Sequence, residues 1–196
     1  SEVLVIADAN ANPAFIAADL LSQAEHGVDS QVMLVTDCMV QAQAVNQQLS
    51  VQLAQLPRQD IAAQALKCSR TLVVKDVVQA VQVSNQYGPE HLIVQTDSPR
   101  ELLSTIRAAG SVFLGAYTPE SVGDYASGTN HVLPTYGYSR AVSSLSLADF
   151  SRRFTVQELS AEGLQNLGQA VMTLAENELL DAHKNAVAIR LASLEK

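Results

Sequence analysis

All four histidines of the chain lie in short polar segments that also contain carboxylates or amides. The clearest of these segments is residues 88–92, where Glu90 and His91 stand side by side before an apolar run. Neutral imidazole is the commonest protein ligand for metals and the usual proton carrier near neutral pH. The recurrence of this pattern predicts a metal-assisted enzyme site whose parts are scattered along the sequence.

Glu90 and His91 are neighbours, and adjacent side chains on an extended chain point in opposite directions. Both can serve one site only if the backbone turns there, and Pro89 favours such a turn. The spacing leaves open the alternative that the two residues are a polar pair at the start of the next strand.

Gln23 and His26 lie three residues apart at the end of a predicted helix, so both project from one helical face. That spacing lets both side chains reach one metal ion. Taken alone, it favours a simpler role in which His26 interacts with the negative end of the helix dipole ahead of Gly27.

Asp124 and His131 fall in a segment rich in Gly, Ser and Thr. Asp124 offers a hard oxygen ligand, and Gly123 and Gly128 free the backbone around it. His131 fits a structural role as well as a functional one.

Glu178 and His183 are five residues apart, which is about 140° around a continuous helix. They can face one ion only if the helix breaks, or if the two residues have different roles. Glu178 extends an apolar stripe, where an unpaired carboxylate is costly, and this points to a site. The alternative is a solvated helix face.

Short apolar runs alternate with helical patterns over the first part of the chain. The predicted strands are residues 3–7, 32–35, 71–74, 92–95 and 111–114. The predicted helices are residues 13–25, 40–56, 59–66, 76–87 and 99–109. This alternation predicts an α/β fold, a Rossmann-like and mainly parallel sheet flanked by helices.

The alternation stops near residue 114. Residues 115–146 read as a long ordered loop around a short helix that opens at 118–120, and loops of this length are often functional. A short strand at 155–159 and a long helical stretch follow, with an apolar stripe formed by Leu164, Leu167, Val171 and Leu174. We predict an α/β domain over 1–145 and a C-terminal helical arm over 146–196 that packs on another domain or subunit.

Composition narrows the class of protein. The chain of 196 residues is 47% hydrophobic with a net charge of −8, which argues against nucleic-acid and anionic-membrane partners. Its apolar runs are too short to span a membrane. Cys38 and Cys68 suit a reducing cytoplasm without disulfides. A strand begins at the first residues with no Met before it, so we expect the chain to continue a domain begun upstream.

Five ordered blocks of the sequence together resemble the histidinol dehydrogenase family, over the whole length of the chain. The blocks are residues 1–8, 20–27, 88–92, 121–135 and 182–187. The resemblance implies a zinc-dependent, four-electron oxidation of L-histidinol to L-histidine through histidinal, the last two steps of histidine biosynthesis, with two NAD⁺ used in turn.

The resemblance also implies roles for particular residues. Zinc would be held by Gln23, His26, Asp124 and His183. His91 would be the base and Glu90 would activate water, while Ser1 and Glu178 would join His91 and the zinc ligands in contacting substrate. The family's homodimer, in which the C-terminal segment reaches the partner's site, would supply Glu178 and His183 from the other subunit. The residues that bind NAD are expected mostly upstream of this chain.

Two other classes of function stay open on the residues alone. A metal-dependent hydrolase would use Glu90 with a metal-bound water and would give no NADH signal. A non-catalytic dimerisation or binding module would carry its histidines for structure only. Such a module would be insensitive to chelators, whereas a metal site is coupled to folding.

Overall fold

The computed structural model describes residues 1–194. The chain divides into two compact units, Ser1–Phe150 and a second that begins at Ser151, and each is described by itself. None of the helices in residues 1–194 is long and apolar enough to cross a membrane.

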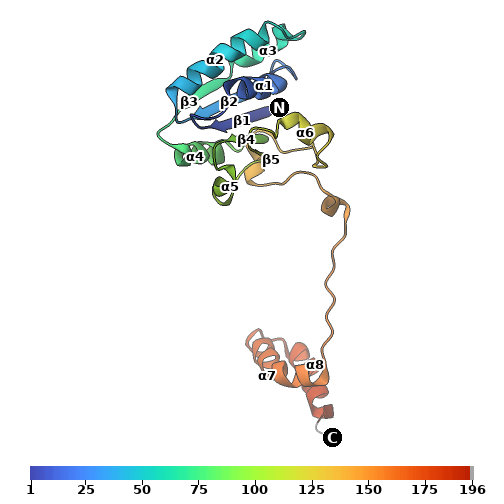
Figure 1. The fold of residues 1–196 in the computed structure, drawn as a ribbon. Helices are drawn as coiled ribbons and strands as arrows, with labels where there is room; N and C mark the ends of the chain where they lie inside the picture. The colour runs from blue at the N-terminus through green and yellow to red at the C-terminus, as the bar shows by residue number, and fades with distance from the viewer. Residues whose placement is uncertain (195–196) are drawn as a thin grey trace. The chain divides into compact units, whose positions relative to one another are not determined.

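The first unit is built on a five-stranded parallel sheet with strand order β3-β2-β1-β4-β5 (Figure 1). Its strands are β1 (Glu2–Ala7), β2 (Gln31–Thr36), β3 (Arg70–Val73), β4 (His91–Gln95) and β5 (Ser111–Leu114). One face is covered by α1 (Pro13–Ala24), α2 (Met39–Leu53) and α3 (Gln59–Lys67), and the other by α4 (Val77–Tyr87) and α5 (Pro99–Leu102) (Figure 1). The predicted Rossmann-like α/β fold is confirmed.

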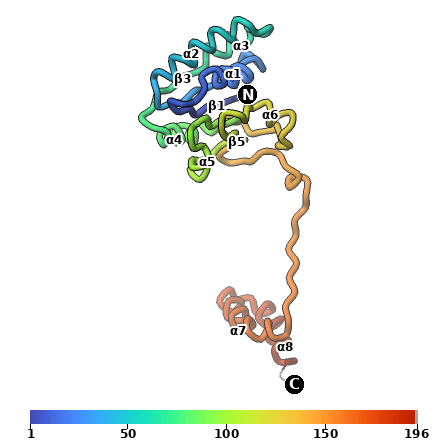
Figure 2. Tube along the Cα trace, viewed as in Figure 1, coloured from blue at the N-terminus to red at the C-terminus, as the bar shows by residue number. Residues whose placement is uncertain are grey.

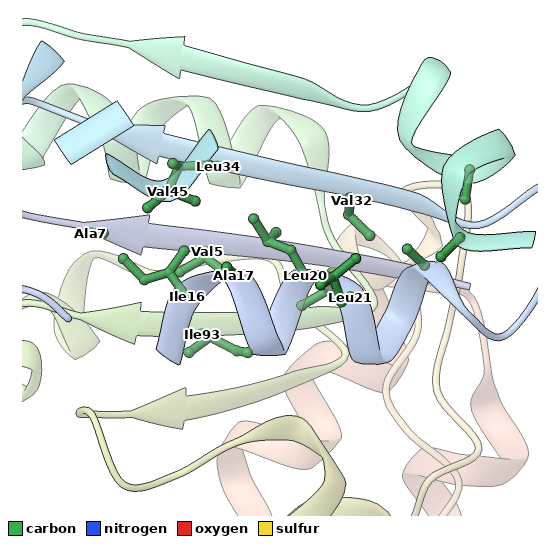
Figure 3. Close-up of a cluster of buried hydrophobic side chains, with 14 of the residues drawn as sticks. Val5, Ala7, Ile16, Ala17, Leu20, Leu21, Val32, Leu34, Val45 and Ile93 are labelled. Atoms are coloured by element: carbon green, nitrogen blue, oxygen red, sulfur yellow. The ribbon is translucent and has the colours of Figure 1, made fainter. Parts of the chain in front are cut away.

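Side chains of β1 and β4 alternate between two apolar layers, because successive residues of a strand point to opposite faces. Val5 and Ile93 pack with Leu20 of α1 in one layer (Figure 3), whereas Leu4 and Leu92 join the layer beneath α4. Burial of each such side chain stabilises the fold by about 1.5–3 kcal/mol. Both faces of the central strands are therefore dry, which explains why their sequences are continuous apolar runs.

Polar residues set the ends of the helices that frame the sheet. The Asn12 side chain accepts a hydrogen bond from the Ala14 N–H (2.9 Å) at the start of α1, and Asp76 accepts one from the Gln79 N–H (2.8 Å) at the start of α4. Gly88 ends α4 with a left-handed φ of 67°, a conformation that glycine adopts without strain. The chain thereby turns directly into Pro89 and β4.

Two elements predicted between residues 99 and 160 differ from the structure. The helix expected over 99–109 stops early, as α5 followed by a 3₁₀ turn at Leu103–Thr105. The Asn85 side chain donates to the Thr105 carbonyl and accepts from the Arg107 N–H, and so replaces helical hydrogen bonds. The strand expected over 155–159 was wrong, since residues 151–160 have no regular structure and pair with no strand in the described part of the chain.

The second unit is a helical hairpin of α7 (Ala161–Asn177) and α8 (Asp181–Leu194) (Figure 2). Leu179 has a φ of 61° and breaks the long helical stretch that the sequence predicts. Gly168 lets α8 approach closely, because a Cβ there would lie 2.7 Å from a methyl group of Leu191. Most of the predicted apolar stripe is exposed in this hairpin, including Leu174 at 63%, so the unit has little core of its own.

We expect Ile93→Ala to lower the free energy of unfolding by about 2–5 kcal/mol, because it leaves a cavity at a fully buried position. Urea unfolding followed by circular dichroism measures this change. Val78→Ala on the exposed face of α4 is the matched control and should change stability by about 0.5 kcal/mol or less. Equal losses in the two variants would contradict the layered core.

Candidate functional site

The candidate site lies where β1 and β4 begin. The two strands are neighbours in the sheet and run parallel, with Val3 paired to His91, so their first residues meet at one edge. His91 is the first residue of β4, not a residue ahead of the strand as the sequence analysis placed it. It points to the same layer as Ile93, two residues along, toward α1 rather than α4.

Glu2 joins Glu90 and His91 through its main chain. Its N–H donates to Glu90 Oε2 at 2.9 Å, and its carbonyl oxygen lies 3.0 Å from His91 Nδ1. The Nδ1 and Oε2 atoms are 4.0 Å apart, so the two side chains do converge. The structure thus brings the two side chains together, after the left-handed turn at Gly88, and their service in one site stays a proposal.

The contact with Glu2 also fixes the proton on the imidazole. A carbonyl oxygen can only accept a hydrogen bond, so in the neutral ring Nδ1 carries the hydrogen and Nε2 keeps its lone pair. His91 is only 4% exposed, and within residues 1–194 its Nε2 has no hydrogen-bond partner. The site therefore holds a buried, unpaired basic nitrogen.

Glu120 joins Glu90 and His91 in one buried cluster, and the sequence analysis missed it. It opens α6 (Glu120–Tyr125), is 2% exposed, and its Oε1 lies 3.9 Å from His91 Nδ1. Burial raises the pKa of Glu120 to about 8, and the nearby carboxylates Asp124 and Glu90 add to the shift. In the sequence it is an ordinary acidic residue in a first helical turn, and no pattern there signals its burial.

Phe113 of β5 forms a wall of the site. Its ring centre is 6.0 Å from that of His91. A Cβ at position 123 would lie 2.6 Å from the Phe113 ring, so the glycine there lets α6 approach the sheet. Close approach of α6 is what carries Glu120 to the imidazole.

The predicted metal ligands of the first unit have unequal surroundings. Gln23 of α1 is completely buried, and neither its Oε1 nor its Nε2 has a partner within residues 1–194. His26 lies beyond the end of α1, in a turn, and is exposed, so it is not on the helix that the sequence predicts for it. Asp124 is half-buried on α6. In the described part of the chain, no three His, Cys, Asp or Glu side chains gather as a metal site.

The other predicted residues are all exposed, but Ser1 adjoins the cluster, because it precedes Glu2 and its amino group opposes the rise in the pKa of Glu120. Ser1 is exposed and its carbonyl accepts from the Gln31 N–H, while His131 is exposed in an irregular segment. Glu178 caps the end of α7, and His183 is exposed on α8. The helix break that would free these two from the geometry of a continuous helix is present at Leu179.

Asp19 and Gln95 form a second buried polar contact on the same side of the sheet, also missed from the sequence. Gln95 Nε2 donates to Asp19 Oδ2 at 2.7 Å. Burial raises the pKa of Asp19 to about 7, although this hydrogen bond opposes the shift. Gln95 is four residues after His91 on β4, so the two side chains point to one face of the sheet.

Comparisons with known proteins match the whole chain. The family model described as histidinol dehydrogenase matches residues 1–191. A histidinol dehydrogenase of Shewanella oneidensis is 81% identical, over 100% of this chain and 44% of the relative, and one of Escherichia coli is 60% identical, over 100% and 45%. The crystal structure of histidinol dehydrogenase from Elizabethkingia anophelis superposes with a TM-score of 0.96 at 52% identity, over 100% of this chain and 45% of that one. The chain thus spans less than half the length of these proteins.

We expect Asp19→Asn to stabilise the protein increasingly as pH rises from about 4 to about 7. In that window the folded state binds a proton on Asp19 that the unfolded state has lost, so the parent protein loses stability as pH rises. The asparagine has no such loss, and the gain has a ceiling of about 4 kcal/mol. Urea unfolding across this pH range measures it, with the exposed Asp29→Asn as the control. A constant difference between variant and parent would contradict the raised pKa.

Proposed function

Because the chain belongs to the histidinol dehydrogenase family, we propose that it is the C-terminal part of an enzyme that oxidises L-histidinol to L-histidine. The reaction passes through histidinal, with NAD⁺ as the hydride acceptor and zinc as the bound metal. The observation that carries the proposal is the buried imidazole of His91, whose Nε2 is unpaired and unprotonated in the neutral ring.

In this proposal His91 is the general base. Its Nε2 takes the proton of the substrate hydroxyl while hydride leaves the adjacent carbon. The hydrogen bond from Nδ1 to the Glu2 carbonyl keeps the ring in the required tautomer and orientation. A main-chain acceptor suits this task, because its position is set by the β1–β4 pairing rather than by a flexible side chain.

Glu90 serves the second oxidation by taking a proton from the water that attacks the aldehyde, with His91 again as the base. The Glu2 N–H donates to one oxygen of the Glu90 carboxylate at 2.9 Å, and this fixes the carboxylate beside the imidazole. Two proton acceptors held by one main-chain residue suit a reaction that removes two pairs of electrons in turn.

Gln23, His26 and Asp124 would hold zinc in the first unit, with His183 of the partner subunit as the fourth ligand. The fit is supported by Gln23, whose buried amide oxygen lacks any partner within residues 1–194 and so is available to a metal. His and Asp are ordinary zinc ligands, whereas the amide of Gln23 is a neutral and weak one, which suits a site whose coordination must leave room for substrate. Zinc, when bound, would position and polarise the substrate, which Ser1 and Glu178 would also contact.

The segment 146–196 would act as the dimerisation arm, beside the α/β domain of 1–145. Support comes from its many exposed apolar side chains, which include Phe154 at 84% and Leu179 at 86%. Apolar surface of this extent on so small a unit marks an interaction surface. We also propose that the residues binding NAD lie mostly in the remainder of the complete enzyme, and that the enzyme works in the cytoplasm, where Cys38 and Cys68 remain free thiols.

Replacing His91 with Asn in the complete enzyme should lower kcat for histidinol-dependent NADH formation by about 10²–10⁴-fold, because the base is lost. Zinc content should be unchanged. The control is His131→Asn, at an exposed position outside the cluster, which should retain parental activity. A parental protein that hydrolyses esters or amides without forming NADH would support the metal hydrolase instead.

Mixing two inactive variants tests the shared site. His26→Asn and His183→Asn should each lose zinc and activity, because each removes a ligand. In randomly mixed dimers about half carry one subunit of each kind, and each of these has one intact site, so activity should return to about a quarter of the parental value. Zinc analysis and NADH formation are the measurements. If mixing restores nothing, the site is not shared between subunits.

A further inference from the structure

We propose that Glu120 is a positioning residue for His91, holding the imidazole from the α6 side and balancing the positive charge that forms when Nε2 takes a proton. This inference rests on the proposed function, because it assigns His91 the part of the base. The sequence pattern alone predicts no role for Glu120, and the role proposed here follows from its place in the fold.

Glu120 approaches the imidazole from an element that has no other bond to it. Its Oε1 is 3.9 Å from Nδ1, while Glu90 Oε2 lies 4.0 Å from the same atom. The Nδ1 hydrogen is already directed to the Glu2 carbonyl at 3.0 Å. Glu120 therefore acts on the ring through its charge and packing, not as the acceptor of a short hydrogen bond.

The burial of Glu120 requires a reason. Its side chain is almost completely enclosed, and its Oε2 has no hydrogen-bond partner within residues 1–194. No lysine or arginine in that part of the chain forms an ion pair with it. A buried carboxyl group without a cation is costly to retain. Two positive charges can act on Glu120: the Ser1 amino group, which opposes the rise in its pKa, and the imidazolium of His91, which lies closest to it and forms in the reaction itself.

In the proposed reaction a positive charge forms on His91. When Nε2 takes the hydroxyl proton, the ring becomes an imidazolium, with Nδ1–H still bonded to the Glu2 carbonyl. A neutral carbonyl offers little compensation for a full charge, whereas a carboxylate a few ångströms away in a dry site offers much more. An ionised Glu120 consequently makes His91 a stronger base, and its loss weakens the base without removing it.

The first test measures the imidazole itself and needs no assumption about substrate. The side-chain pKa of His91 is followed by ¹H–¹⁵N NMR in the complete protein and in its Glu120→Gln variant, which keeps the shape of the side chain. The variant should show a lower pKa for His91, because Glu120 can ionise as the imidazolium forms beside it, whereas glutamine cannot. The control is Glu101→Gln, at an exposed position on α5, which should leave the pKa unchanged. An unchanged His91 pKa in Glu120→Gln would overturn the proposal.

The second test measures turnover at about pH 9. This pH lies above the raised pKa of Glu120, about 8, so the carboxylate is ionised. We expect Glu120→Gln to lower kcat by about tenfold or more, with KM for histidinol and zinc content nearly unchanged. The acidic limb of the kcat profile should move to lower pH. A raised KM with parental kcat would instead make Glu120 a substrate contact and overturn the positioning role.

The two tests separate this proposal from the proposed function. A parental enzyme that forms no NADH from histidinol contradicts the proposed function, while the NMR titration still decides the role of Glu120. If Glu120→Gln does not fold, Glu120→Asp replaces it. Aspartate keeps the carboxylate but holds it farther from the ring. Both kcat and the His91 pKa should therefore fall by less than is expected for Glu120→Gln, and parental values of both would overturn the proposal.

Discussion

The contact between His91 Nδ1 and the Glu2 carbonyl is the interaction on which the candidate site depends. It exists only because β1 and β4 are parallel neighbours in one register, with Val3 opposite His91. A shift of one residue in that register would turn His91 to the other face of the sheet, toward α4 and away from α6. The same pairing directs the Glu2 N–H to Glu90, so a single main-chain residue orients both reactive side chains.

The rest of the first unit stabilises this polar edge of the sheet. Two apolar layers keep β1 and β4 rigid, and α6 is drawn against the sheet at Gly123, where a side chain would strike Phe113. Gly110 has a comparable part, since a Cβ there would lie 2.5 Å from the Glu90 carbonyl oxygen. Small residues at these points let carboxyl groups and an imidazole crowd into a volume from which water is largely excluded. Such crowding strengthens every charge interaction in the site.

The second unit, the hairpin of α7 and α8, has no comparable core in its described residues. Its hairpin is held by the close approach of α7 and α8 at Gly168 and by the turn at Leu179, yet most of its apolar side chains are exposed. A unit of this size with so little internal core has little apolar burial to stabilise it by itself. This is the reason for proposing that it is an arm that completes another subunit's site, with Glu178 and His183 in the proposed roles.

The sequence by itself determined the fold class, because apolar runs, caps and turn residues are local signals that act over a few positions. It also singled out Gln23, Glu90 and His91, because each histidine of the chain lies in a short segment that also contains carboxylates or amides. Only the tertiary structure decided which side chains meet. Glu120 and Asp19 look like ordinary acidic residues of helices, and their burial follows from how α6 and α1 pack on the sheet. The early end of the 99–109 helix depended likewise on Asn85, which is distant in sequence. Contacts between distant segments are set by the packing of whole elements, and no local pattern encodes them.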